Sequence, residues 1–510
     1  MVCKVLTSTV IGLDAYKIEV EVDLVNSLPS VSIVGLPDAA VNEARERVRS
    51  AIKNSSFSFP QKKVVVNLAP ADIKKEGTNF DLPIAVGILI EEGVIQEEKT
   101  QGVAFIGELS LDGTLRSIIG VLPHVLGLKN AGVKTVIVPK ENAKEASLAD
   151  GITILSANNL NEVVNNFIET PLEVVKTNVD KYLAKGVEES YLYDFKDVKG
   201  QQKAKKALEI AAAGGHNMIM VGTPGSGKTL MAKCFASILP PLELSEALEL
   251  TKIYSVSGLL ANNEPLMVKR PFRAVHHTAS ANGIIGGGTN PKPGEITLAH
   301  RGVLFLDEIV EFPRNVLEVL RQPLEDGEVV ISRAKHSIKY PADFMLLAAM
   351  NPCPCGYLGD KEKHCTCTEY QINRYRAKLS GPLLDRIDIQ IDVPRLTTDE
   401  LLNTNTEAES SADIRKRVIN ARKIQKERYK EAGILTNSQL TADMVKKYCQ
   451  IDESSKEILK LAVAKYQLSG RRYDRVLKLS RTIADLDNSE IITTKHITQA
   501  LQYRFSEQMN

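Results

Sequence analysis

The pattern of hydrophobic and polar positions divides the chain into regions of different character. Residues 1–168 alternate short strand-like runs with helical stretches, and the clearest strand is residues 17–24, where apolar and charged residues alternate. Residues 39–55 carry apolar positions at helical spacing. Residues 196–395 again alternate strands and helices, an order that favours a parallel sheet covered by helices. From residue 396 to residue 510 strand signals nearly vanish, which predicts a helical domain.

Further short apolar runs in the first region are also predicted to be strands. They are residues 30–36, 62–69, 102–111, 134–139 and 152–155. Residues 169–195 are polar with weak periodicity and are interpreted as a linker. In the last region the helical spacing is clearest in residues 411–430, 454–467 and 475–487. The pattern therefore predicts an α/β protein with an N-terminal domain (1–168), a central domain (196–395) and an all-helical C-terminal domain (396–510).

Composition narrows the class of protein. The 510 residues suit about three domains, and 64 basic against 63 acidic residues give a formal net charge of +1. This balance argues against a protein that coats nucleic acid or a membrane by bulk charge, although it leaves room for a local basic channel. The N-terminus lacks the pattern of a signal peptide, and the apolar runs stay short of the ~20 residues that cross a bilayer. We therefore expect a cytoplasmic protein without a membrane partner.

A phosphate-binding loop is the strongest chemical signal. Between a strand-like run and a helical run lies a match to G-x-x-x-x-G-K-[ST], the context that this motif requires. Its glycines let backbone N–H groups wrap phosphates, the lysine reaches the β and γ phosphates of ATP, and the hydroxyl ligates Mg²⁺. The alternative is a glycine-rich turn before an ordinary helix. The motif comprises Gly222, Thr223, Pro224, Gly225, Ser226, Gly227, Lys228 and Thr229.

Two later strands end in polar residues that suit the same site. Residues 303–306 form an apolar run followed by Asp307 and Glu308, and buried parallel strands carry ligands at their carboxyl ends. Asp307 is expected to help hold hydrated Mg²⁺ and Glu308 to polarise the attacking water. An apolar run followed by two acids could equally be a surface feature when taken alone, but its place about eighty residues after a phosphate loop favours the metal site. Residues 344–350 form a third such strand ending at Asn351, which either orients the water or is a turn residue before proline.

Four of the seven cysteines cluster within one short stretch, which points to a metal rather than to disulfides. They form two C-x-C pairs separated by a segment of glycine and charged residues. Four thiolates at this spacing suit tetrahedral Zn²⁺ in a closed structural site. Free thiols, a redox pair and an iron–sulfur cluster are the alternatives, and His364 is a candidate to replace one thiolate. The cluster comprises Cys353, Cys355, Cys365 and Cys367.

With these motifs in this order, the central region resembles the AAA+ ATPase core. The stretches between them resemble the magnesium-chelatase-like AAA+ proteins, and within that group the bacterial YifB/ComM competence proteins. These stretches are residues 270–280, 286–288, 293–300 and 381–388. The resemblance covers nearly the whole chain and implies a Lon-protease-like (S5-like) N-terminal domain, an ATPase core and a helical lid.

The resemblance also assigns roles to single residues. It places Asn351 at the sensor 1 position, and Arg386 at the arginine finger that enters the neighbouring subunit's nucleotide site. Arg471 is the candidate for sensor 2, with the adjacent Arg472 as the alternative. For Arg386 the alternative is a surface ion pair with Asp385 or Asp388. Related ring helicases place a β-hairpin in the central pore, where Arg333 and Lys335 of this chain are expected to contact DNA phosphates.

Three other features are interpreted with the resemblance in view. Residues 74–85 resemble the Lon segment that carries the nucleophilic serine, but the matching position is Asn79, and Leu122 stands near the partner lysine's place. Without a nucleophile or its base we expect no peptidase activity. Residues 414–430 contain eight basic residues and one acidic residue. This run is interpreted either as a DNA-binding helix face or as a helix face that is only exposed to solvent. His276 and His277 either contact DNA or have a structural role.

Together these observations predict an ATP- and Mg²⁺-dependent motor, with structural Zn²⁺, that acts on single-stranded and branched DNA. The resemblance implies a homohexamer that promotes branch migration during natural transformation, with recombination proteins as further partners. The alternative is a chelatase-type motor that drives metal insertion or protein remodelling.

Overall fold

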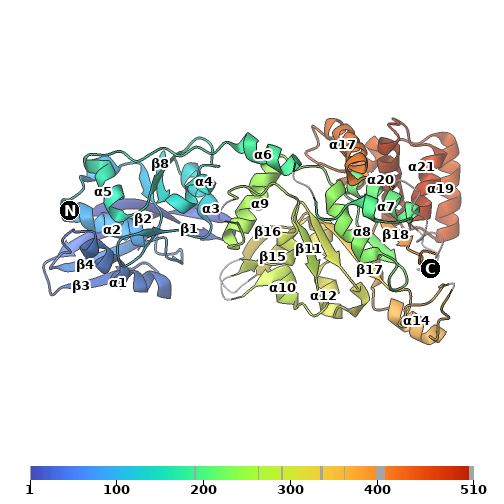
Figure 1. Cartoon of the computed structure of the whole chain (residues 1–510), viewed down its shortest axis with the longest axis horizontal. Coiled ribbons are helices and arrows are strands. Elements are labelled where there is room, and N and C mark those ends of the chain that lie inside the picture. The colour runs from blue at the N-terminus through green and yellow to red at the C-terminus, as the bar shows by residue number, and fades with distance from the viewer. Residues whose placement is uncertain are drawn as a thin grey trace. The chain divides into compact units, whose positions relative to one another are not determined.

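The chain folds into two compact units (Figure 1). The first comprises Met1–Gly186 and Glu243–Val268, and the second comprises Val187–Leu242 and Lys269–Asn510. Residues 243–268 thus belong to the first unit although they lie inside the range expected for the central domain. The structure, a computed structural model, describes residues 2–188, 191–261, 264–288, 291–332, 337–360, 362–397 and 408–504.

A mixed seven-stranded sheet forms the centre of the first unit, in the order β3-β4-β2-β1-β5-β8-β9. Five of the six strands predicted in this region are confirmed, and the sixth, residues 102–111, is divided into two short strands of different sheets. Strand β1 was not predicted, because Thr7, Ser8 and Thr9 interrupt its apolar pattern and yet are buried. The strands are β1 (Cys3–Ile11), β2 (Asp14–Val25), β3 (Ser30–Val34), β4 (Lys63–Ala69), β5 (Val103–Phe105), β8 (Thr135–Pro139) and β9 (Thr153–Ala157), with a separate small ribbon of β6 (Glu108–Leu109) and β7 (Leu115–Arg116).

Helices pack on the sheet of the first unit. Helix α1 (Ala39–Asn54) confirms the predicted helical spacing and begins where the Asp38 carboxylate accepts from the Val41 N–H. Helix α2 (Asp81–Glu91) is buried almost throughout and packs against β1, β2 and α1. The remaining longer helices are α3 (Val121–Asn130), α5 (Leu160–Ile168) and α6 (Val179–Glu188), and α6 lies in the segment interpreted as a linker.

Helix α9 (Leu244–Val256) belongs to the first unit, although in sequence it lies between two segments of the second unit. It packs against α3, and Val256 lies where a side chain at Gly120 would touch it. The Ser255 hydroxyl donates to the buried carboxylate of Glu145, which also accepts from the Leu122 N–H at 3.1 Å. These buried contacts fasten α9 to the first unit.

A five-stranded parallel sheet forms the centre of the second unit, in the order β11-β14-β17-β10-β18. The three central strands are entirely buried, as expected for a sheet covered on both faces. All carboxyl ends therefore lie at one edge. The strands are β10 (Met218–Val221), β11 (Phe272–Val275), β14 (Val303–Leu306), β17 (Met345–Met350) and β18 (Ile389–Asp392).

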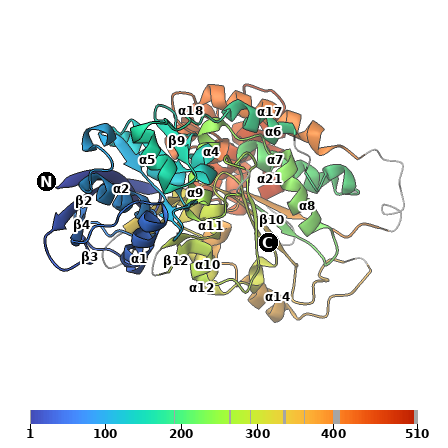
Figure 2. The same cartoon turned by 60° about the vertical axis from the view of Figure 1, so that its left-hand side comes forward.

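The predicted helical C-terminal region is confirmed, and two of its helices pack against α7 (Gln202–Gly214) while the others pack on those two or on one another (Figures 1 and 2). Alanine-rich α7 contacts α17 and α20, and α20 contacts α21. The helices are α17 (Ser411–Arg428), α18 (Ala442–Tyr448), α19 (Glu453–Tyr466), α20 (Gly470–Leu486) and α21 (Thr494–Arg504). Among the helices of the described residues, none is long and apolar enough to cross a bilayer.

Candidate functional site

The phosphate loop lies between β10, at the centre of the parallel sheet, and α8 (Lys228–Phe235). Gly225 and Gly227 adopt left-handed φ angles of 77° and 90°, which favour glycine. A Cβ on Gly222 would lie 2.2 Å from the Val393 carbonyl oxygen, so only glycine fits between the loop and the end of β18. The predicted glycines are therefore each required by the backbone path.

Lys228 lies over this loop. Its Nζ donates to the Gly222 carbonyl at 2.6 Å and to the Thr223 carbonyl at 2.9 Å, and lies 3.5 Å from Asn351 Oδ1. Burial lowers the pKa of Lys228 to about 8, against the opposing charges of Asp307 and Glu308. An anionic phosphate at this position would stabilise the charged form further and would replace the carbonyls as the lysine's partner.

Oxygen ligands for Mg²⁺ meet beside the lysine. The Thr229 hydroxyl donates to Asp307 Oδ2 at 2.8 Å, because the start of α8 lies beside the carboxyl end of β14. A hydroxyl and a carboxylate are the hard oxygen ligands that Mg²⁺ prefers, and they leave room for water and phosphate oxygens. The residues present thus fit the metal that the phosphate loop implies.

Glu308 follows Asp307 in a strained conformation. Its φ of 51° lies in the left-handed region, and its N–H donates to Asp307 Oδ1 at 3.0 Å. The side chain is 53% exposed, and His277 Nδ1 lies 3.9 Å from Glu308 Oε2. The Glu308 carboxylate is therefore accessible to solvent. His277, considered for DNA contact or a structural role, lies beside this carboxylate.

Arg386 and Arg471 form a second group, on the carboxylate of Glu325. Arg386 donates through Nε to the Arg321 carbonyl at 3.0 Å and through Nη1 to the Pro382 carbonyl at 2.8 Å, and its Nη2 pairs with Glu325. Arg471, at the start of α20, lies 3.6 Å from the same carboxylate. The sequence analysis missed Glu325, because an exposed acid between two loops has no motif.

The neighbouring arginines of α20 pair with the acids on either side of Arg386. Arg472 Nε lies 2.8 Å from Asp385, and Arg475 pairs with the buried Asp388. Burial alone would raise the pKa of Asp388, but the charges of Arg475 and His216 hold it well below its usual range. The ion pairs considered for Arg386 are thus formed by α20 instead.

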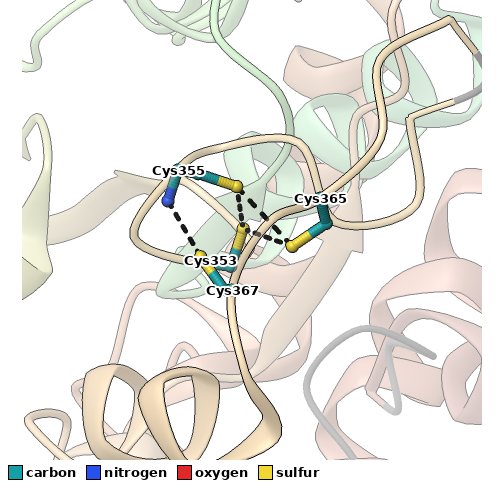
Figure 3. A group of neighbouring side chains, drawn as sticks. All are labelled: Cys353, Cys355, Cys365 and Cys367. Atoms are coloured by element: carbon teal, nitrogen blue, oxygen red, sulfur yellow. Dashed lines mark hydrogen bonds between the residues drawn. The ribbon is translucent and has the colours of Figure 1, made fainter.

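The four clustered cysteines converge, as the spacing predicted (Figure 3). All four Sγ atoms lie within 4.8 Å of one another, and Cys353 lies 3.4 Å from Cys355 and 3.6 Å from Cys365. A tetrahedral Zn²⁺ with bonds of ~2.3 Å would separate sulfur atoms by about 3.8 Å. The backbone N–H of Tyr357 lowers the pKa of the Cys355 thiol to about 6, which favours a thiolate ligand.

The cysteine loop also touches the phosphate loop. Gly356 lies so close to Pro224 that a Cβ on it would come within 2.9 Å of the proline ring, and within 3.9 Å of Asn351 Cγ. The Asn351–Pro352–Cys353 segment joins β17 directly to the cluster. A metal held by the cysteines would therefore brace both the phosphate loop and the amide beside it.

Comparison with known proteins agrees with this geometry. Three family models match the chain. The model described as magnesium chelatase, subunit ChlI, matches residues 194–401, and the model described as subunit ChlI of Mg-chelatase matches residues 20–142. The model of the C-terminal region of magnesium chelatase subunit ChlI matches residues 408–504. The chain is 44% identical to Competence protein ComM of Haemophilus influenzae, over 97% of this chain and 95% of the relative. It is 40% identical to the uncharacterized protein YifB of Escherichia coli, over 98% and 96%.

The chain belongs to the magnesium-chelatase-like ComM/YifB family. It is also 25% identical to a magnesium-chelatase subunit ChlI homolog of Methanocaldococcus jannaschii, over 46% of this chain and 68% of the relative. The mixed α/β fold with its parallel sheet and helical C-terminal region is that of an AAA+ protein of this family. AAA+ proteins of this family are ATPases that use ATP and Mg²⁺.

The DNA contacts expected for a ComM/YifB protein are only partly within the described residues. Strands β15 (Glu328–Ser332) and β16 (Ser337–Pro341) form a hairpin, but Arg333 and Lys335 lie outside the described residues. The arginines in the basic run of α17 are engaged in packing, whereas its lysines are exposed. Arg417 pairs with Glu209 at 2.6 Å and Arg422 donates to the Ala212 carbonyl at 2.8 Å, so these arginines attach α17 to α7.

The residues that were compared with a Lon site lie buried in the first unit. Asn79 donates to the Ser8 carbonyl at 2.9 Å, and Leu122 is fully buried. The Ser8 hydroxyl lies 2.9 Å from His124 Nδ1, a pair that the sequence analysis missed because it is separated by 116 residues. Burial lowers the pKa of His124 to about 4. Since all four side chains are buried, the Ser8–His124 pair is a packing contact rather than an open catalytic pair.

Proposed function

We propose that this chain is the subunit of a homohexameric, ATP-driven motor that moves on single-stranded and branched DNA and promotes branch migration during natural transformation. The observation that carries the proposal is the 44% identity, over nearly the full length of both chains, to a relative named as a competence protein. The nucleotide site supports a motor, because Lys228, Thr229, Asp307 and Asn351 converge at the carboxyl edge of one sheet. Recombination proteins are the further partners that this role implies.

In the proposed reaction, the phosphate loop binds ATP and Lys228 neutralises the β and γ phosphates. Thr229 and Asp307 would hold Mg²⁺, which supplies Lewis-acid stabilisation of the transferring phosphoryl group. Glu308 accepts a proton from the attacking water, and Asn351 orients that water against the γ-phosphate. Preorganised positioning of this kind is the main source of catalysis in phosphoryl transfer.

Arg386 would complete the site of the neighbouring subunit. A guanidinium delivered in trans stabilises the charge on the transferring phosphoryl group and accelerates hydrolysis by about 10³–10⁵ in known cases. Arg471 lies on the same carboxylate as Arg386, which supports a shared role at the subunit boundary and favours it over Arg472, the partner of Asp385. We expect the variant Arg386→Ala to bind ATP normally and to lose ATP hydrolysis.

We infer that the cysteine cluster holds structural Zn²⁺. The four converging sulfurs support this, and the contact of Gly356 with Pro224 supports a bracing role. Metal analysis of protein purified without a chelator should give about one zinc per chain. Less than half an equivalent contradicts the assignment.

We also infer that the first unit is a Lon-like module without peptidase activity, which binds DNA or scaffolds the ring. The position that matches the Lon nucleophile holds Asn79, and an amide cannot attack a peptide bond. Casein digestion in the presence of ATP tests this inference, and proteolysis that is lost in Lys228→Ala contradicts it.

The experiment that tests the DNA motor is unwinding of forked and three-way-junction DNA by the full chain with ATP and Mg²⁺ at low salt. Wild type should displace strands, and Lys228→Ala should not. Binding should weaken steeply with added salt, because phosphate neutralisation releases counterions. ATPase activity that is indifferent to DNA, together with no strand displacement, overturns the proposal.

A chelatase-type motor that drives metal insertion or protein remodelling is the second candidate. The matches to three ChlI models, which together span most of the chain, favour it. It predicts ATPase activity that responds to partner proteins and not to DNA, so the same assay separates the two functions.

A further inference from the structure

The carboxylate of Glu325 lies close to two positively charged side chains. Its two carboxylate oxygens face two different guanidinium groups, with Arg386 Nη2 on Oε2 and Arg471 Nη2 at 3.6 Å from Oε1. The adjacent acids are each matched by one arginine of α20, since Asp385 pairs with Arg472 and Asp388 with Arg475. Glu325 is thus one carboxylate shared by two guanidinium groups, and a phosphate could replace it as the partner of either.

Arg386 is held inside its own chain. Each of its three nitrogens has a partner, and the side chain is only 14% exposed. Two of the partners are neutral carbonyls, of Arg321 and Pro382, whereas Glu325 is an anion. A phosphate of a neighbouring subunit would have to compete for Arg386 mainly with this carboxylate, because charged hydrogen bonds are the stronger ones.

Glu325 is also close in sequence to the hairpin expected in the pore. It lies in α13 (Pro323–Asp326), which ends at Gly327 with a left-handed φ of 68°, and β15 begins at Glu328. The far end of the hairpin is tied to the same turn, since the Ala342 N–H donates to the Gly327 carbonyl at 2.7 Å. A displacement of the hairpin is therefore transmitted to the end of α13.

We propose that Glu325 is a latch on Arg386, which holds the guanidinium back until DNA displaces the hairpin and frees it for the neighbouring subunit's ATP. The latch rests on the proposed function, in that Arg386 acts in trans and the β15–β16 hairpin contacts DNA. Glu325 is a positioning residue, because it acts on the phosphate only through the arginine.

The test is Glu325→Gln in the full chain, which removes the charge and keeps the shape. DNA-free ATPase turnover should rise about threefold, the scale set by one half-exposed ion pair, with the KM for ATP within about twofold of wild type. Glu325→Asp, which restores the charge, should return turnover toward wild type. Adding Arg386→Ala to Glu325→Gln should abolish the gain. The control is Glu264→Gln, which removes a more exposed ion pair with Lys185, in the first unit, and should leave turnover unchanged.

The outcomes separate the latch from the proposed function. Unchanged or lower turnover in Glu325→Gln, with hexamer assembly intact by gel filtration, overturns the latch. Forked DNA should stimulate wild type more than Glu325→Gln, and equal stimulation of both refutes release by the hairpin. If DNA stimulates neither protein while the Arg386-dependent gain persists, the DNA motor fails and the restraint of Arg386 by Glu325 stands.

Discussion

Asp385 and Asp388 lie three residues apart on either side of Arg386 and have the same chemistry, but they differ in burial. The Asp388 side chain is 7% exposed and accepts from His216 at 3.2 Å while pairing with Arg475. The Asp385 side chain is 35% exposed and pairs with Arg472. Replacing each by asparagine therefore measures what burial adds to the strength of an ion pair.

Asp388→Asn should be strongly destabilising, because it leaves Arg475 and the nearby buried Arg504 without their counter-charge. Breaking one partner of a buried pair costs about 3–5 kcal/mol, which lowers the Tm of the second unit by roughly 6–15 °C. Asp385→Asn should cost only ~0–1 kcal/mol, because water screens the pair. Far-UV circular dichroism and calorimetry measure both, and equal Tm losses in the two variants would refute the reasoning.

The same carboxylate predicts how stability depends on pH. The folded-state pKa of Asp388 is below its unfolded value of about 4, so its contribution is fully present above that value and is lost as the pH falls through the folded pKa. Wild type should therefore lose stability below about pH 4 more steeply than Asp388→Asn does. Parallel acid profiles for the two proteins would contradict the depressed pKa.

Three more predictions concern the sites described above. Gly222→Ala places a Cβ against the Val393 carbonyl and should weaken binding of a fluorescent ATP analogue by tenfold or more, and unchanged affinity would contradict the close approach. Cys355→Ser should cut bound zinc by more than half and lower the Tm, and full zinc retention would remove Cys355 from the ligand set. Arg417→Gln should lower the Tm by a few degrees and leave DNA affinity unchanged, because this arginine pairs with Glu209. A loss of salt-dependent DNA affinity in this variant would instead indicate that α17 binds DNA.

The nucleotide site could be predicted from the sequence because each part is local. The phosphate loop, Asp307 and Asn351 each follow an apolar strand, and parallel strands bring their carboxyl ends to one edge whatever lies between them. The cysteine cluster was predicted for the same reason, since two short pairs need only one turn of the loop to meet. Local spacing was enough in both cases.

Contacts between distant segments could not be predicted. The charge run of α17 gave no sign that Arg417 and Arg422 attach the helix to α7, because a packing arginine and a solvated one have the same sequence. Strand β1 was hidden by three buried polar residues in its middle. The contact of Glu325 with Arg386 spans 61 residues and joins a four-residue helix to the segment after another, and both are too short to carry a periodic signal.

Because residues 243–268 also belong to the first unit, no single cleavage of the chain separates the two units. The chain passes between the two units three times, after Gly186, after Leu242 and after Val268. Removing residues 1–186 would leave α9 with its apolar face uncovered and its partner α3 gone, so the remaining ATPase fragment should aggregate. An isolated nucleotide-binding fragment would instead require a short bridge in place of residues 243–268, and the first unit alone would require α9 to be fused to its end.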